Sequence, residues 1–216
     1  MEPILISACL LGEKCNYKGG DSKVDFVEEL NRYFDLVPFC PEVAGGLPTP
    51  RDPSEIRGSF VIQQTKKGER DVTSVFLDGA YKATTVCSYL GIRYAIMTER
   101  SPSCGSHQVH DGYFRNRLIP GEGIAVAALR RMGVTVMNEE EGRAFLEEFK
   151  KNDAKRAEAT AAARAKDEAR EKAKESKPQE SKPAKFQGKP KGPKKPGWSY
   201  QGKTRPHAHH QSKPKK

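Results

Sequence analysis

The chain has 216 residues, with 38 Lys and Arg against 28 Asp and Glu, a formal net charge of +10. No apolar run reaches the roughly 20 residues that cross a bilayer, and the first residues lack the basic region and apolar segment of a secretory signal. The five cysteines, an odd number, favour free thiols in a reducing compartment over a disulfide framework. We therefore expect a cytoplasmic protein without a membrane span.

The charge divides the chain into two regions. Residues 1–150 carry 18 basic and 21 acidic side chains, a net charge of −3, and have the length of one domain. Residues 151–216 carry 20 basic and 7 acidic side chains, a net charge of +13, with Phe186, Trp198 and Tyr200 as their only aromatic residues. Because such a segment buries too little apolar surface to offset the entropy of ordering, we predict a basic tail, partly helical and then disordered.

Within residues 1–150, short apolar runs predict strands and longer amphipathic segments predict helices. Strands are expected at 4–8, 36–39, 94–98 and 134–137, a β-ribbon at 60–62 with 70–72, and helices from Asp21-Ser22 to Tyr33, at 74–90, at 124–132 and from Glu139 onwards. Four prolines and two glycines in residues 40–53 predict no regular element there. The alternation of strands and helices predicts an α/β, Rossmann-like fold, a mostly parallel sheet with helices on both faces.

Three cysteines follow three of the predicted strands. Cys9 comes directly after the first strand, Cys40 after the second, and Cys104 a few residues after the third. Because the loops at the carboxyl ends of parallel strands share one edge of the sheet, the three thiols are expected to converge in a crevice there. Thiolates are ligands of zinc and of iron–sulfur clusters, and the paired C-x-x-C spacing of structural zinc sites does not occur. Three scattered cysteines around a cluster would leave one iron open to a substrate atom.

The other two cysteines differ in their surroundings. Cys87 lies in a predicted helix and is expected to pack in the core, as free cysteines commonly do. Cys15 lies in the loop after Cys9, where packing and a functional role stay equally open. No G-x-G-x-x-G follows the first strand and no Walker A motif is present, so the sequence does not point to a nucleotide.

Three segments together resemble the thiouracil desulfurase family over about residues 3–140. They are Cys9-x-x-Gly12-x-x-Cys15-x-Tyr17-x-Gly19, then Cys40-Pro41-Glu42 followed by Gly45-Gly46-x-Pro48-x-Pro50-Arg51, and Ser101-Pro102-Ser103-Cys104-Gly105. The resemblance implies a Rossmann-like fold and a [4Fe–4S] cluster held by three cysteines, which correspond here to Cys9, Cys40 and Cys104. Family members remove sulfur from thiolated uracil, and a relative with an extra domain acts on 4-thiouridine in tRNA. Lys18 stands where the family pattern has an aspartate.

The implied reaction is a non-redox exchange of sulfur for oxygen, in which an iron acts as Lewis acid and a base activates water. Glu42, two residues after Cys40, is our candidate for the general base. Ser101 and Ser103 are candidates for hydrogen bonds to substrate or to a cluster sulfur, with a turn role as the alternative. Arg51 and Asp52 are candidates for substrate binding, with a surface ion pair as the alternative.

Two functions of different classes follow from these features. The first is a [4Fe–4S]-dependent desulfurase that acts on thiolated pyrimidines, either free or within a tRNA bound through the basic tail. The second is a non-catalytic RNA-binding or ribosome-associated protein whose cysteines hold a structural metal and whose lysines contact phosphates. A brown protein with absorbance near about 400 nm after anaerobic purification would favour the first.

Overall fold

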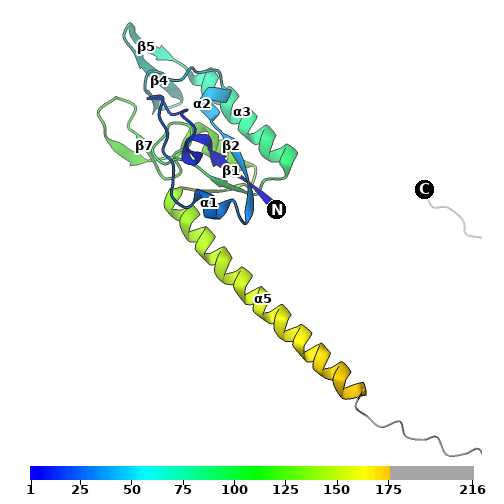
Figure 1. Cartoon of the computed structure of the whole chain (residues 1–216). Helices are drawn as coiled ribbons and strands as arrows, with labels where there is room; N and C mark the ends of the chain where they lie inside the picture. Colours follow the sequence, from blue (N-terminus) through cyan, green and yellow to red (C-terminus); the bar gives the residue numbers. More distant parts are fainter. Residues whose placement is uncertain (176–216) are drawn as a thin grey trace, which may run out of the picture. The chain divides into compact units, whose positions relative to one another are not determined.

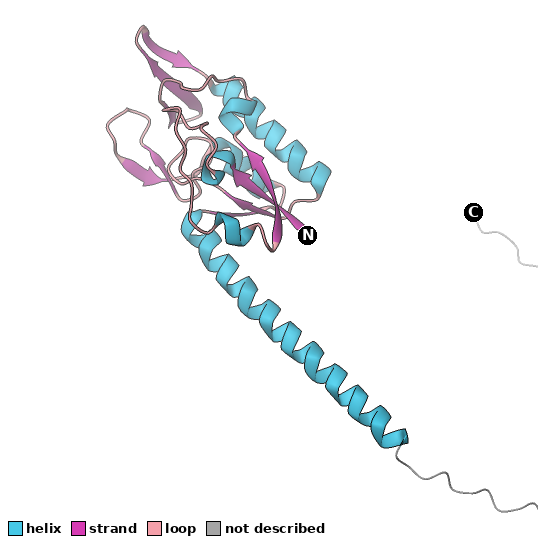
Figure 2. Cartoon of the chain, viewed as in Figure 1, coloured by secondary structure: helices cyan, strands magenta, loops and turns pink. Residues whose placement is uncertain are grey.

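The computed structural model describes residues 1–175, with the side chains of residues 1–172. The chain divides into two units, Met1–Lys166 and Asp167–Lys216. The helices of the first unit and its strands are coloured separately in Figure 2. The predicted disordered and RNA-contacting part of the tail, residues 176–216, lies outside the described residues.

Four parallel strands form the central sheet of the first unit. They are β1 (Glu2–Ser7), β2 (Phe34–Phe39), β6 (Tyr94–Ile96) and β9 (Thr135–Met137), in the order β2-β1-β6-β9. Ile4 of β1 pairs with Leu36 on one side and with Tyr94 on the other. The four predicted strands and their parallel arrangement are confirmed, so all of them end at the same edge of the sheet.

Helices pack on both faces of this sheet. Successive side chains of a strand point to opposite faces, and Leu5 packs with residues of α3 (Thr73–Leu90) and α4 (Ile124–Arg131). Ile4 and Ile6 instead pack with residues of α1 (Val27–Leu30) and α5 (Glu139–Glu175). In Figure 1, α3 and the first turns of α5 lie on different sides of the strands β1 and β2. The layered α/β class expected from the sequence is therefore confirmed.

Two smaller antiparallel sheets are added to this framework. The strands β3 (Ser54–Arg57), β4 (Phe60–Thr65) and β5 (Gly68–Asp71) form one of them, which confirms the predicted ribbon and adds β3 to it. The strands β7 (Gln108–His110) and β8 (Leu118–Pro120) form a hairpin that the sequence did not predict. Its strands have three residues each, too few to show the alternation of apolar and polar residues by which a strand is recognised in a sequence.

Two predicted elements differ from the structure near the cysteines. The helix expected from Asp21-Ser22 to Tyr33 is reduced to α1, because Ser22 and Val24 donate their N–H groups to the carbonyls of Cys9 and Leu10 instead. The segment 40–53, expected to be irregular, begins with one helical turn, α2 (Pro41–Ala44). Proline favours the first position of a helix because its φ angle is already helical, so Pro41 starts this turn.

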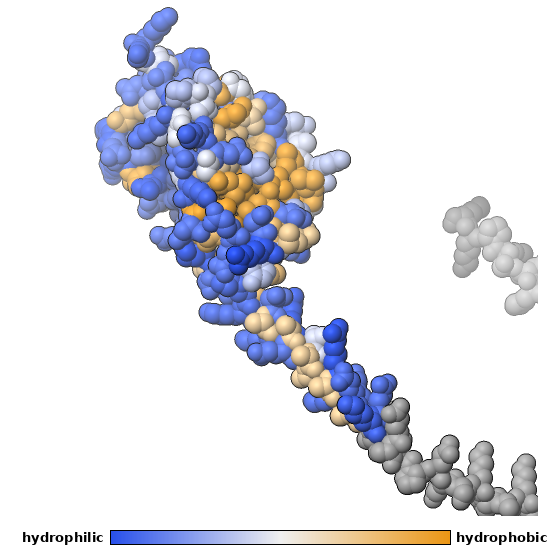
Figure 3. All heavy atoms as spheres, in the orientation of Figure 1, coloured by the Kyte–Doolittle hydropathy of each residue, from blue (hydrophilic) through white to orange (hydrophobic). Residues whose placement is uncertain are grey.

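The last helix, α5, begins with reciprocal hydrogen bonds and contributes to the core only near its start. The Asn138 side chain accepts the N–H of Glu141, and the Glu141 carboxylate accepts the N–H of Asn138, which is a capping box. Phe145 and Phe149 of α5 pack against Phe34, whereas residues 151–172 are all exposed. In Figure 3 hydrophobic residues gather on the viewed face of the first unit, and α5 is mostly hydrophilic. Within the described residues, no helix is long and apolar enough to cross a membrane.

Candidate active site

A cavity of about 450 Å³ lies at the carboxyl ends of β1, β2 and β6. Its lining includes Cys9, Cys40 and Cys104 together with Cys15. The three cysteines expected to converge there are therefore brought to one cavity from positions up to 95 residues apart in the sequence. Cys87, by contrast, is buried on the face of the sheet that α3 and α4 cover, as predicted.

Each cysteine is fixed by short local structure just beyond a strand. Cys9 lies in a 3-10 helix, η1 (Ala8–Leu11), that directly follows β1. Cys40 is the N-cap residue of α2. Gly79 of α3 packs directly against this turn, since a Cβ atom at Gly79 would lie 2.0 Å from the carbonyl oxygen of Pro41. Cys104 lies in a turn closed by the Gly105 N–H donating to the Ser101 carbonyl at 2.9 Å.

The site disfavours thiolates when no cation is bound. Burial raises the pKa of the Cys104 thiol well above its ordinary value, and Glu42, Cys40 and Cys9 raise it further. Burial followed by the neighbouring Cys40 and Cys9 raises the pKa of Cys15 to about 12. Burial also raises the pKa of Cys9, although the Thr98 hydroxyl, 3.0 Å from its sulfur, opposes this. A bound metal would supply the positive charge that stabilises these groups as thiolates.

These donors fit a cluster better than a single ion. Within residues 1–175, no three His, Cys, Asp or Glu side chains converge as one metal ion requires. In a four-iron cluster each cysteine binds a different iron, so its ligands surround a larger volume than those of one ion. Three sulfur donors around one cavity, of which Cys9 and Cys104 are buried and Cys40 is half-buried, match that chemistry. Cys15 packs beside Cys9 and Cys40 in the same cavity, which the sequence left open.

Glu42 is held in the cavity by two other candidate residues. The Arg51 Nε donates to Glu42 Oε2 at 2.7 Å, and the Ser101 Oγ donates to Glu42 Oε1 at 3.3 Å. The side chains of Arg51 and Glu42 are only 3% and 11% exposed, so the pair is shielded from water. Arg51 also donates to the Cys15 carbonyl at 3.0 Å, which joins the carboxylate to the cysteine loop. Both oxygens of Glu42 are thereby oriented.

Of the remaining candidate residues, Ser101 lines the cavity, whereas Ser103 and Asp52 do not. Ser101 lines it and also accepts the N–H groups of Ser103 and Cys104, both at 3.1 Å, so it shapes the turn as well. Ser103 is buried and not part of the lining, and its carbonyl accepts the N–H of Ala125 at the start of α4. The Asp52 side chain is exposed and also lies outside the lining.

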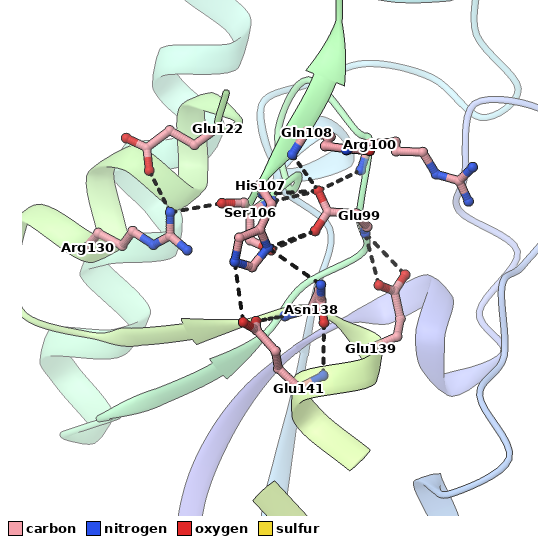
Figure 4. Close-up of polar contacts among 10 residues, drawn as sticks. All are labelled: Glu99, Arg100, Ser106, His107, Gln108, Glu122, Arg130, Asn138, Glu139 and Glu141. Carbon is pink, nitrogen blue, oxygen red and sulfur yellow. Dashed lines mark hydrogen bonds and ion pairs between the residues drawn. The ribbon is translucent and has the colours of Figure 1, made fainter. Parts of the chain in front are cut away.

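The loop that carries Cys104 is organised by Glu99, which the sequence analysis did not single out. Oε1 of Glu99 accepts four backbone N–H groups, and Oε2 accepts the Ser106 hydroxyl at 2.8 Å (Figure 4). The four donors are Arg100, Ser106, His107 and Gln108, at 3.0 to 3.2 Å. Burial by itself raises the pKa of Glu99, but these hydrogen bonds outweigh it and lower the pKa to about 2. An ionised carboxylate therefore closes this loop.

The Glu99 group also joins the loop to the neighbouring helices. The Glu99 N–H donates to both carboxylate oxygens of Glu139 at the start of α5, and His107 lies between Glu99 and Glu141, 3.3 Å from each (Figure 4). Arg130 of α4 donates to the Ser106 carbonyl at 2.9 Å. The third cysteine loop is thus fixed from α4 and α5, and His107 has a structural position outside the cavity.

The sequence model of the 2-thiouracil desulfurase family matches residues 4–141. The chain belongs to this family. A solved structure of the [4Fe-4S]-dependent thiouracil desulfidase TudS is similar, with 43% sequence identity and a TM-score of 0.61 over 65% of this chain and 93% of that chain. The uncharacterized protein YbbK of Bacillus subtilis (strain 168) is 36% identical over 146 residues, which are 64% of this chain and 96% of YbbK.

Membership in the 2-thiouracil desulfurase family confirms the resemblance inferred from the cysteine segments. The matched region begins in β1 and ends at the start of α5, so it contains all three cysteine loops. Ser7, the last residue of β1, and Thr98, two residues after β6, also line the cavity, and sequence reasoning missed both. The available signal was their place at the last or last-but-one residue of a predicted strand.

Proposed function

We propose that this protein is a [4Fe–4S]-dependent enzyme that removes sulfur from thiolated pyrimidines. The observation that carries the proposal is one cavity in which Cys9, Cys40 and Cys104 lie together with the buried, oriented carboxylate of Glu42. The similarity to a [4Fe-4S]-dependent thiouracil desulfidase supports the same chemistry. Cys9, Cys40 and Cys104 would hold the cluster.

When bound, a cluster with three cysteine ligands supplies a Lewis-acidic iron for the sulfur of a thiocarbonyl. Glu42 then serves as the general base. One of its oxygens takes a proton from water, the water oxygen bonds to the ring carbon that bears the sulfur, and the C–S bond breaks. The sulfur leaves with its bonding electrons as hydrosulfide and a carbonyl replaces the thiocarbonyl, so no external oxidant or reductant is consumed.

Arg51 and Ser101 orient this base. The Arg51 guanidinium pairs with the Glu42 carboxyl group away from water, and a buried carboxyl group needs such a partner. Ser101 fixes the second oxygen and, through the N–H groups of Ser103 and Cys104, couples it to the third cysteine turn. The base and the ligand loop are therefore placed by one hydrogen-bonded unit.

The proposed substrate range includes a thiolated base within tRNA. The net charge of +13 in residues 151–216 supplies lysine and arginine side chains that could neutralise phosphates, with Trp198 and Tyr200 available to stack on bases.

The experiment is anaerobic incubation of the cluster-reconstituted full chain with 2-thiouracil, 4-thiouridine and thiolated tRNA. Sulfide is assayed together with the oxygen-containing product, whose oxygen should carry the label when the reaction is run in ¹⁸O-water. Stoichiometric sulfide and labelled product from at least one compound are expected. A reconstituted protein that releases sulfide from none of them would overturn the proposal.

A further inference from the structure

One part of the cavity lining comes from outside the parallel sheet. Ser54 and Glu55 belong to β3, His110 ends β7, and Phe114 and Asn116 belong to the loop that joins β7 to β8. We call these five residues the second wall, to separate them from the cysteine loops. None of them lies in the three segments that resembled the family in sequence. They offer one aromatic ring and several hydrogen-bonding groups, and they include no cysteine.

The loop in this wall is clamped onto β3. Glu55, which is 7% exposed, accepts the N–H groups of Gly112 and Phe114 at 2.9 Å each through Oε2. The Arg57 Nε donates to the Gly112 carbonyl at 2.7 Å. Gly112 has φ +87°, and a Cβ atom there would lie 2.5 Å from the Ile56 carbonyl oxygen, so only glycine allows this close approach. The backbone at Phe114 is therefore held from two sides.

The two loop residues that line the cavity have unusual backbone conformations. Phe114 and Asn116 both have φ +55°, in the left-handed region that bulky residues rarely adopt. Such conformations persist where the surrounding structure imposes them, and they concentrate at functional sites. A glycine would adopt this φ angle more easily than Phe114 does. The chain nevertheless has an aromatic residue at this position, and that residue lines the cavity.

The other aromatic residues of the lining have other contacts. Phe39 packs against the core cluster that α3 and α4 cover. The Tyr17 ring is approached by the Lys18 ammonium, whose nitrogen lies 5.4 Å from the ring centroid. No aromatic or cation–π pair of Phe114 occurs among the described residues. Phe114 is therefore the lining aromatic residue that we take as the partner of a planar ligand.

The second wall also holds unused hydrogen-bonding capacity. Among the described residues, two buried side-chain polar atoms lack a hydrogen-bond partner, Ser54 Oγ and His110 Nδ1, and both belong to this wall. The nearest acidic group to His110 Nδ1 is Glu55 Oε1 at 4.0 Å, too far for a hydrogen bond. Buried polar atoms normally find partners, so such exceptions point to a missing group.

We propose that the second wall recognises the heterocycle of the substrate, with Phe114 stacking on the ring and Ser54 Oγ and His110 Nδ1 bonding to its polar edge. This inference rests on the proposed function. The ligand class is a planar six-membered ring that carries N–H and C=O groups beside the thiocarbonyl, since a hydroxyl and an imidazole nitrogen can each complement either group. Glu55 is the positioning residue, because it holds the loop that presents Phe114.

The test compares Phe114→Leu and Ser54→Ala with matched changes outside the cavity, Phe60→Leu and Ser59→Ala, in the cluster-reconstituted full chain. Phe60 and Ser59 are exposed residues at the β3–β4 turn. Phe114→Leu should raise KM for 2-thiouracil about 10-fold with kcat and iron content unchanged, because base–aromatic stacking is lost. Ser54→Ala should raise KM about 5-fold through one lost hydrogen bond. Both control variants should stay within about twofold of the wild type.

Two further measurements keep the test independent of turnover and of folding. Binding of uracil, which has no sulfur for iron, is followed by equilibrium dialysis and should weaken in parallel with the rise in KM. Phe114→Tyr keeps the ring face and should stay near the wild type. Equal KM values in Phe114→Leu and the wild type, or an equal rise in Phe114→Leu and Phe114→Tyr, would overturn the stacking role. A wild-type protein without any sulfide release would instead contradict the proposed function, while uracil binding would still test the wall.

Discussion

The two parts of the cavity lining are built in different ways. The cysteine loops follow three parallel strands at one edge of one sheet, with Cys9 and Cys40 next to their strand ends and Cys104 in a turn farther along its loop. The second wall combines two antiparallel sheets and a loop whose shape depends on a buried carboxylate in another strand. The comparison indicates that the positions of the cysteines follow the order of strands along the chain, whereas the second wall, like the clamp on Glu42, depends on contacts between segments far apart in the sequence.

The largest expected effect is loss of a cluster ligand, which tests whether the cysteine loops carry the chemistry. Cys9→Ser, Cys40→Ser and Cys104→Ser should each lose most bound iron and reduce desulfuration to background, because an alcohol is a poor ligand for iron in a cluster. Cys87→Ser is the matched control and should keep its iron, since Cys87 lies in the core. Full iron and sulfide content in the three variants, with loss in Cys87→Ser, would show that the ligands are assigned wrongly.

Replacing the base should separate catalysis from cluster binding in the same part of the cavity. Glu42→Gln keeps the shape of the side chain but cannot take a proton, so kcat should fall by about 10²-fold or more with iron content unchanged. Glu148→Gln, a change of an exposed residue on α5, serves as control. Wild-type turnover in Glu42→Gln would place the base elsewhere.

A third prediction concerns Glu99, whose carboxylate fixes the third cysteine loop through hydrogen bonds. The pKa of Glu99 is lowered, so its stabilising effect is complete above the ordinary carboxyl value near 4.5 and is lost as the pH falls toward about 2. Glu99→Gln should reduce the free energy of unfolding by about 2 kcal/mol at pH 7, measured by urea denaturation of the iron-free protein. The difference between the two proteins should shrink below about pH 4.

Urea titrations at pH 7 and pH 3 decide this prediction. Glu139→Gln is a useful comparison, because Glu139 accepts only the Glu99 N–H in this group and should have a smaller effect. A Glu99→Gln protein with the same pH dependence of stability as the wild type would mean that the loop is held by its other contacts.

The smallest expected effect on the free-base reaction is deletion of residues 151–216. Residues 151–172 are exposed, and no proposed site residue lies beyond position 116. The truncated protein should bind the cluster and desulfurate free 2-thiouracil within about twofold of the full chain. Binding to tRNA should weaken and become less sensitive to salt, because the deleted region carries the charge of +13. Titrations of both proteins with tRNA at two salt concentrations measure the affinity and its salt dependence. Equal affinities with equal salt dependence would show that the tail does not contribute to RNA binding.

The sequence alone determined the part of the site that depends on local order along the chain. Strand-sized apolar runs followed by Cys9, Cys40 and Cys104 predicted both the parallel sheet and the edge at which the thiols meet, since parallel strands end at one edge. The segments around these cysteines also indicated the 2-thiouracil desulfurase family, whose sequence model matches residues 4–141.

Only the tertiary structure decided what surrounds the cysteines. That Arg51 and Ser101 hold Glu42, that Glu99 closes the Cys104 loop, and that Asp52 stays outside the lining depend on side-chain directions that no spacing encodes. The shortening of the helix at 21–33 had the same origin, because Ser22 and Val24 gave their N–H groups to the cysteine loop. Periodicity reports which face of an element is buried, whereas a hydrogen bond between distant segments forms only when the fold brings its donor and acceptor together.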